Sequence, residues 1–331
     1  MSRHPLVALA AAFVIALAWA PAAPRAQSPD QPLRISAGGV TGVYFALSSA
    51  FCRLLEPDLA LRVERCEALT SPGTVSNIRL VRAGAADLGL AQAGLIRFAA
   101  AGAGPFEIDG ANPTLRVLFS TVLEKLTIIA APGLDIQTAD QLLGKVVDFG
   151  PFGSGSRATA ELYLHSLDLA RRDFLPAATL SSALNPRALC RGNADAFVFI
   201  AAQPNSVVQE SISRCGARIV PGNSENIASF AEQYVDYVPA VIPADLYSGL
   251  TRDVPTFGVR AFVIADARLP DDTAYRLTRT VFEKLEELRR LHLAFARLEP
   301  ADLLSPCPGV PFHPGALRYF REAGLTPPAC D

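Results

Sequence analysis

The chain has 331 residues, 50% of them hydrophobic, and its 30 basic residues nearly balance 32 acidic ones to give a formal net charge of −2. No basic patch interleaves with aromatic residues, so nucleic acid is excluded as a sensible partner. The length suits two domains, or one two-lobed protein with ample hydrophobic cores.

The N-terminus carries the pattern of a secretory signal peptide. Arg3 and His4 precede an apolar run over residues 6–20, and small residues follow as far as Ala26. A basic start, an apolar run and a small-residue cleavage zone predict a signal peptide over residues 1–26 that is cleaved after Ala22 or Ala26. The alternative is an uncleaved anchor, although the run is shorter than the roughly 20 residues that span a membrane. The sequence therefore predicts export, with a periplasmic mature protein.

The mature chain begins with a strand, a glycine-rich loop and a helix. Residues 33–37 predict a short strand, residues 38–42 (GGVTG) form the loop, and apolar residues at helical spacing continue from Val43 to Leu55. Glycines let backbone amides approach a ligand, and a helix start supplies unpaired N–H groups. An ordinary tight turn would show the same pattern.

The same order of elements recurs twice. Residues 71–77 open a predicted helix that stops at Gly84, and residues 87–92 predict a buried strand that ends in Gln92. A short helix near Arg187 and a strand up to Phe199 repeat this pattern. Strands that alternate with helices favour mostly parallel sheets, whose ligands gather at the carboxyl ends of the strands.

Two long apolar segments, residues 115–130 and 257–265, predict the two crossings between lobes. The fold class that follows is α/β, a two-lobed binding protein with a mostly parallel sheet flanked by helices in each lobe and a ligand in the cleft between them. Lobe I is expected to be discontinuous, over residues 33–122 and 262–331, and lobe II to cover residues 123–261. Residues 271–291 predict one long helix in the last part of lobe I.

The loop GPFGSGSR (150–157) lies directly before an amphipathic run. A nucleotide-binding P-loop needs a lysine that is missing here, and a nucleophilic serine needs the pattern Gly-x-Ser-x-Gly. Neither a catalytic constellation nor a cofactor site is indicated, so no enzyme is predicted. We expect a seat for a ligand carboxylate at the helix start near Ser154–Ser156. The plainer alternative is a serine N-cap with Arg157 in solvent.

The cysteines are even in number and fall outside the signal peptide. In an exported chain this favours disulfide bonds. Sequential pairing is the preference among the possible connectivities, and the three histidines beyond residue 26 do not cluster with cysteine at zinc-ligand spacing, so no metal site is expected. The cysteines stand at Cys52, Cys66, Cys190, Cys215, Cys307 and Cys330.

Seven segments in order resemble the TAXI family, the solute-binding proteins of one class of tripartite ATP-independent periplasmic (TRAP) transporters. The resemblance extends over about residues 33–325, with Phe45–Ala46 and the segment AQP (202–204) as departures from the family pattern. The segments are ISAGGVTGVYF (35–45), GTVSN (73–77), GAADLGLAQ (84–92), GPFGSGSRAT (150–159), DVPTFGV (253–259), LPDD (269–272) and HPGALRYF (313–320).

The resemblance implies two hinged lobes that hold a small carboxylate, such as glutamate, glutamine or a related organic acid, and deliver it to TRAP membrane subunits driven by an ion gradient. A monomer is expected. Two alternatives remain open: a binding protein that reports ligand to a membrane sensor kinase, and the solute-binding protein of an ABC transporter. The ligand contacts that the family implies are Gly39, Thr41, Val43, Tyr44, Thr74, Gln92, Ser154, Gly155, Ser156 and Arg157.

Overall fold

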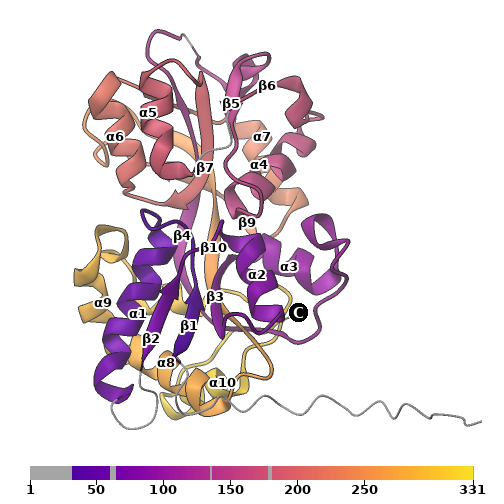
Figure 1. Ribbon diagram of the computed structural model, residues 1–331, viewed down its shortest axis with the longest axis vertical. Helices are drawn as coiled ribbons and strands as arrows, with labels where there is room; N and C mark the ends of the chain where they lie inside the picture. The colour runs from indigo at the N-terminus through magenta and orange to yellow at the C-terminus, as the bar shows by residue number, and fades with distance from the viewer. Residues whose placement is uncertain (1–31, 60–64, 135, 178–180, 331) are drawn as a thin grey trace, which may run out of the picture.

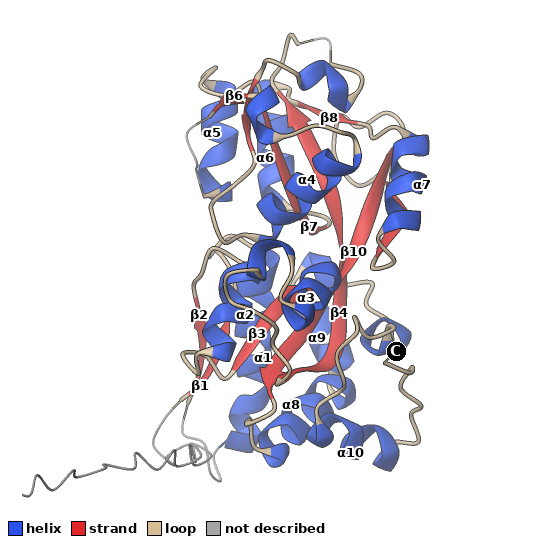
Figure 2. Cartoon of the chain, turned by 90° about the vertical axis from the view of Figure 1, so that its right-hand side faces the viewer, coloured by secondary structure: helices blue, strands red, loops and turns tan. Residues whose placement is uncertain are grey.

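Two lobes are stacked along the long axis of the molecule, and two long strands run through both (Figures 1 and 2). The structure is a computed structural model that describes residues 32–59, 65–134, 136–177 and 181–330. The predicted signal peptide lies outside these residues. The predicted α/β two-lobed fold class is confirmed, with helices packed on both sides of the strands.

The expected mostly parallel sheet in each lobe is wrong in one respect, because one mixed hydrogen-bonded sheet of ten strands connects the lobes and the pairings of β4 and β10 are antiparallel. The strand order of this sheet is β2-β1-β3-β10-β4-β7-β5-β6, while β8 pairs with β4 and β9 pairs with β10. The short strands β1, β2 and β3 pair in parallel, as do β5, β6 and β7. The strands are β1 (Leu33–Ser36), β2 (Cys66–Leu69), β3 (Leu88–Gln92), β4 (Leu115–Ala130), β5 (Val146–Asp148), β6 (Leu175–Pro176), β7 (Ala196–Ala202), β8 (Arg218–Val220), β9 (Tyr237–Ile242) and β10 (Val254–Asp266).

The predicted crossing segments are the antiparallel strands β4 and β10, and both change partners along their length. In β10 the residues up to Val259 pair with β9, and those from Ala261 pair with β3. In β4 the residues from Glu124 onward pair with β7. Both strands are buried against neighbours along most of their length, and this explains why their sequences are mostly apolar. The division at residues 122 and 261 falls close to these changes of partner and stays a prediction.

The helices divide between the two lobes. The lower lobe in Figure 1 contains β1–β3 with α1–α3 and α8–α10, so both ends of the described chain lie there; the upper lobe contains β5–β8 with α4–α7. Their bounds are α1 (Val43–Leu59), α2 (Thr74–Arg82), α3 (Ala93–Ala101), α4 (Gly155–Ser166), α5 (Asn185–Cys190), α6 (Ser206–Cys215), α7 (Ser224–Gln233), α8 (Asp271–Glu283), α9 (Leu285–Leu291) and α10 (Pro314–Glu322).

The expected long helix over residues 271–291 is wrong in one respect, because it is broken into α8 and α9 at Lys284. Lys284 has φ −106° and ψ 26°, outside regular helical geometry. Its ammonium group donates to the carbonyl of Leu54 at the end of α1. The break thus lies where α8 and α9 both pack against α1, which apolar spacing alone does not reveal.

The preferred disulfide connectivity is confirmed. Cys52–Cys66 joins α1 to β2, Cys190–Cys215 joins the ends of α5 and α6, and Cys307–Cys330 holds the C-terminal segment. Each bond therefore connects segments of a single lobe, so no disulfide links the two lobes, and the chain passes between them only in β4 and β10.

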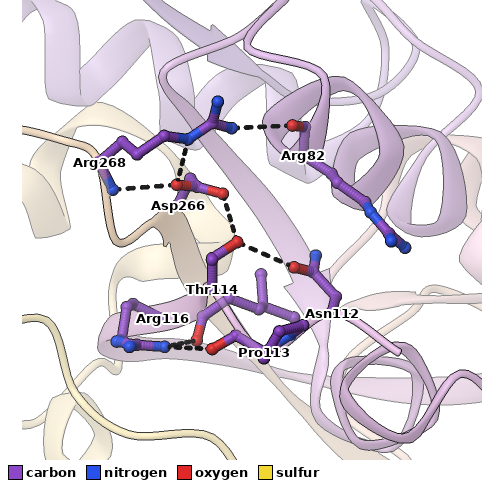
Figure 3. A network of polar contacts seen from close by, with 8 residues as sticks. Arg82, Asn112, Pro113, Thr114, Arg116, Asp266 and Arg268 are labelled. Atoms are coloured by element: carbon purple, nitrogen blue, oxygen red, sulfur yellow. Dashed lines mark hydrogen bonds and ion pairs between the residues drawn. The ribbon is translucent and has the colours of Figure 1, made fainter. Parts of the chain in front are cut away.

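A polar network fixes the lower ends of the two long strands (Figure 3). Asp266, at the end of β10, accepts hydrogen bonds from Thr114 Oγ1 (2.6 Å) and from Arg268 Nε (2.6 Å). Arg268 also donates to the carbonyl of Arg82 at the end of α2. The network connects the beginning of β4, the end of β10 and the end of α2. It therefore holds the two long strands and α2 in place relative to one another.

Candidate functional site

A cavity of about 540 Å³ lies between the lobes. This volume is typical of sites for small molecules. The lower lobe contributes two loops, two helix starts and the end of β3; β4 contributes one side chain; the upper lobe contributes the loop before α4, part of β7 and the starts of α5 and α6. The lining residues are Gly38, Gly39, Thr41, Gly42, Val43, Tyr44, Thr70, Ser71, Pro72, Gly73, Thr74, Gln92, Glu124, Gly150, Pro151, Ser154, Gly155, Ser156, Ser181, Ser182, Asn185, Val198, Phe199, Ile200, Ala201, Asn205 and Val207.

The structure brings nine of the ten predicted contact residues to this cavity and leaves one outside. Arg157 does not line it. Its guanidinium lies 3.6 Å from the centre of the Phe152 ring and pairs with Glu161 at 3.0 Å. The nine residues around the cavity are Gly39, Thr41, Val43, Tyr44, Thr74, Gln92, Ser154, Gly155 and Ser156.

Several helices begin at the cavity, and three of them, α1, α2 and α4, start in or beside the glycine-rich loops. Val43 opens α1, Thr74 opens α2 and Gly155 opens α4. The first N–H groups of a helix have no acceptor within the helix, and the positive end of its dipole favours an anion. Two of these helices belong to the lower lobe and one to the upper lobe, so an anion between them would interact with both.

Gly155 permits the close approach of α4 to the lower lobe. A Cβ atom at this position would lie 2.6 Å from Thr74 Oγ1 and 2.8 Å from Gln92 Oε1. Thr159, one turn later in α4, donates to Gln92 Oε1 at 2.9 Å, and the N–H of Ser76 donates to the carbonyl of Gly153. The two lobes are thus in direct contact at one side of the cavity.

The serines at the start of α4 have structural partners. Ser154 Oγ accepts a hydrogen bond from the N–H of Arg157 at 3.1 Å, which makes Ser154 the N-cap. Ser156 Oγ accepts from the N–H of Ile200 at 3.0 Å and so attaches α4 to β7. The capping alternative is therefore correct for Ser154 but wrong for Arg157, which is 6% exposed and does not lie in solvent. Both serines still line the cavity.

Glu124 is the residue of the site that the sequence analysis missed. It lies on β4 with 4% of its surface exposed, and its Oε2 accepts hydrogen bonds of 2.9 Å from both Tyr44 Oη and Gln92 Nε2. Burial raises the pKa of Glu124 to about 7, even though these two hydrogen bonds act in the opposite direction. Burial and the neighbouring Glu124 also raise the pKa of Tyr44 well above its ordinary value.

A signal for Glu124 was present in the sequence. It interrupts an apolar run of β4, and a buried acid within such a run is unusual enough to suggest a function. The prediction of a buried strand from apolar sequence assigns all of its residues to the core. It does not show which side chain faces a cavity.

The upper lobe adds polar residues that no motif indicated: Ser181, Ser182, Asn185 and Asn205. Asn205 Oδ1 caps α6 through the N–H of Val207 at 2.9 Å. Asn185 is 3% exposed, and its Oδ1 has no hydrogen-bond partner among the described residues. It is therefore an acceptor in the cavity wall that a ligand with a donor group could satisfy.

The charge of the cavity wall is limited to one carboxyl group. Glu124 is its single ionisable acid, and none of the described lining residues is Lys, Arg or His. Within the described ranges, no three His, Cys, Asp or Glu side chains gather as metal ligands, and no helix is long and apolar enough to cross a membrane. Any anion in the cleft would be held by N–H groups, hydroxyls and amides.

Comparison with known structures agrees with the architecture. The periplasmic binding protein BugD matches with a TM-score of 0.55 at 13% identity, over 89% of this chain and 98% of BugD. A protein from Bordetella bronchiseptica RB50 matches with a TM-score of 0.52 at 12% identity, over 89% of this chain and 99% of that one. At such low identity the likeness is one of fold.

The family follows from a match of the sequence itself. The model of the NMT1-like family covers residues 35–324, which include every element that lines the cavity. The chain therefore belongs to the NMT1-like family.

Proposed function

We propose that this chain is an extracytoplasmic solute-binding protein that captures one small carboxylate between its lobes. The observation that carries the proposal is the convergence of helix starts from both lobes, those of α1, α2 and α4 among them, on one cavity of about 540 Å³. Such starts favour anions, and hydrogen bonds to a charged partner contribute about 1.5–3 kcal/mol each. The name of BugD as a periplasmic binding protein supports the same role.

The ligand is a glutamate-like or glutamine-like amino acid or a related organic acid, and it leaves chemically unchanged. The TAXI-like segments support this ligand class and a TRAP-type permease, driven by an ion gradient, as the partner. Four of the segments that carry the resemblance contribute residues to the cavity wall: ISAGGVTGVYF (35–45), GTVSN (73–77), GAADLGLAQ (84–92) and GPFGSGSRAT (150–159). The basic, apolar and small-residue pattern of the N-terminus supports export to the periplasm, where a monomer would capture its ligand.

A thermal-shift screen tests the ligand class. The purified mature protein is mixed with amino acids, dicarboxylates, alkanesulfonates, sugars and divalent metal ions. A ligand that binds the folded state stabilises it by RT ln(1 + [L]/Kd), about 2.7 kcal/mol at a hundredfold excess over Kd. We expect a carboxylate to raise the Tm. A rise in Tm with sugars or metal ions alone would contradict the proposal. A rise in Tm with sulfonates alone would show that the cleft binds a different class of anion.

A second measurement tests the absence of turnover. The ligand recovered after prolonged incubation with the protein should be unchanged by mass spectrometry, at one ligand for each chain. Conversion of the ligand would show that the cleft is an active site.

A further inference from the structure

Glu124 places an acid where the proposed ligand also carries one. It is the sole ionisable acid among the described lining residues, and no cationic side chain lines the cavity to offset it. Two ionised carboxylates in one buried site repel each other strongly, and one of them then holds a proton instead. The geometry around Glu124 shows how this repulsion is avoided.

The two hydrogen bonds to Glu124 fall on the same oxygen. Tyr44 Oη and Gln92 Nε2 both donate to Oε2, and no hydrogen bond to Oε1 is found among the described residues. Gln92 is held in this orientation by Thr159, which donates to its Oε1. Since Oε2 already accepts two donors, a proton on the neutral acid belongs on Oε1, where it can serve as a donor to a ligand in the cavity.

No charged group near Glu124 competes for this role. Its register partners are Val259 on β10 and Ala202 on β7, and the helices α1 and α2 present Tyr44 and Thr74. The nearest charged side chains along the strands are engaged elsewhere. Lys125 donates to the carbonyl of Val241, and Arg260 donates to the carbonyl of Thr121 and pairs with Asp302.

We propose that Glu124 is a specificity-determining residue of the cleft, which donates a hydrogen bond from Oε1 as a neutral carboxylic acid to a carboxylate oxygen of the ligand. Where Glu124 is ionised in the free protein, one proton from solution forms its O–H bond when the carboxylate enters, and this proton returns to solution when the ligand leaves. This inference rests on the proposed function, because it concerns the same cleft and the same ligand class.

The pKa of Glu124 determines how proton uptake and ligand affinity should change with pH. Burial raises this pKa to about 7, so in the free protein the carboxyl group loses its proton on passing above neutral pH. Below that pH the acid is already neutral, and binding takes up no proton. Above that pH, binding of each ligand is coupled to the uptake of one proton from solution by Glu124. The affinity for the ligand should therefore weaken by up to about tenfold for each further pH unit.

Isothermal titration calorimetry of the wild-type mature protein tests this with succinate and glutarate, which carry no ammonium group. Titrations in two buffers of different ionisation enthalpy give the number of protons taken up. We expect about one proton for each ligand near pH 8 and close to zero near pH 6.5, where both probes are still mainly dianions, with Kd rising above neutral pH. L-glutamate serves as a third probe, because its ammonium group could instead pair with an ionised Glu124.

The variant Glu124→Gln assigns the proton to this residue. Its amide keeps an acceptor for Tyr44 and Gln92 and a donor for the ligand, so it should bind succinate or glutarate with no proton uptake and with a Kd that is flat between about pH 6.5 and pH 8.5. Glu67→Gln, at an exposed position of β2, is the matched control and should keep the wild-type uptake.

The outcomes separate the inference from the proposed function. Binding of the probes without proton uptake overturns the inference alone. Binding of L-glutamate alone, with an affinity that rises with pH, also overturns it, because Glu124 would then be an ionised partner of an ammonium group. If none of the three carboxylates binds, the proposed function fails for this ligand class and the inference fails with it.

Discussion

Gly155 and Thr74 belong to different lobes, yet a Cβ atom on Gly155 would lie 2.6 Å from Thr74 Oγ1. A separation this short cannot be accommodated without movement, and Gln92 Oε1 and Thr74 Cβ would lie within 3.0 Å as well. Gln92 has little freedom to move, because Thr159 and Glu124 hold both ends of its amide. The absence of a side chain at Gly155 is therefore what allows the lobes to meet.

The substitution Gly155→Ala should weaken carboxylate binding at least tenfold, about 1.4 kcal/mol, because the start of α4 can no longer approach the lower lobe. Calorimetry with the best ligand of the thermal-shift screen measures the effect, and circular dichroism checks that the variant is folded. An unchanged Kd in a folded variant would show that contact between the lobes at this point is unnecessary for binding.

Arg157 should contribute to stability and leave the affinity unchanged. Its guanidinium stacks on Phe152, which is itself 72% exposed, and pairs with the half-exposed Glu161. Arg157 itself is only 6% exposed, so its contact with the Phe152 ring is largely out of water and contributes about 2 kcal/mol, while the pair with Glu161 adds up to about 1 kcal/mol. Arg157→Ala should therefore lower the free energy of unfolding by about 2–3 kcal/mol. A tenfold loss of affinity at unchanged stability would instead place the guanidinium on the ligand.

Glu124 should make the protein less stable as the pH rises. Between pH 4.5, the ordinary pKa of the group, and about pH 7, the folded protein retains a proton that the unfolded chain has lost. The free energy of unfolding should fall by about 3 kcal/mol across this window and then level off. Urea denaturation at a series of pH values measures this loss.

Glu124→Gln should remove that loss, so above neutral pH the variant should be more stable than the wild type. Glu67→Gln should reproduce the wild-type curve, since Glu67 is exposed. Identical curves for the wild type and Glu124→Gln would show that the carboxyl group is ionised in the folded protein throughout this range.

Asp266 should stabilise the base of the long strands. Burial acts to raise its pKa, but the hydrogen bonds from Arg268 and Thr114 outweigh burial, and the pKa lies below its usual value. Asp266→Asn weakens these bonds and should cost about 2–4 kcal/mol of unfolding free energy. Arg116→Ala is the matched control, because Arg116 in Figure 3 donates only to the nearby carbonyls of Pro113 and Leu115.

The pH dependence of the Asp266 contribution has the opposite sign to that of Glu124. A depressed pKa stabilises the folded state above the unfolded value of 3.8, and this stability is lost as the pH falls through the lower folded pKa. The difference between the wild type and Asp266→Asn should therefore shrink below about pH 4. A constant difference down to pH 2 would exclude the ionised carboxylate as its source.

The three disulfides should leave no thiol to react in the exported protein. Alkylation without reductant, followed by mass spectrometry, should label none of the six cysteines. Replacing the pair Cys190 and Cys215 with serine should cost roughly 2–4 kcal/mol of unfolding free energy. Labelling of several cysteines in the untreated protein would contradict this connectivity.

The sequence predicts the helices and strands of this protein better than the residues that line its cleft. Short apolar strands next to glycine loops and amphipathic helices give β1, α1, α2, β3 and α4 close to their observed bounds, because local pattern determines each element. The break at Lys284 depends on packing of α8 and α9 against α1, which local pattern does not contain.

The residues of the cleft also fall into two groups, those that lie in sequence motifs and those whose role depends on residues distant in sequence. Loop residues such as Thr41 and Ser156 lie in glycine-rich motifs and are found by inspection. Glu124 lies in the middle of a crossing strand, and its role depends on Tyr44 and Gln92, which are distant in sequence. Arg157 shows the converse, since its position at the end of the motif GPFGSGSR does not determine the direction of its side chain.

The register of the two long strands makes the upper lobe an excisable module. Leu123 on β4 lies opposite Arg260 on β10, so the chain enters and leaves the upper lobe at neighbouring points. A tight hairpin turn between these two residues would close the sheet of the lower lobe, with β1, β2, β3 and both ends of the described chain retained. In engineering terms, the lower lobe is a host domain, and the upper lobe is an insert that can be exchanged to change what the cleft selects.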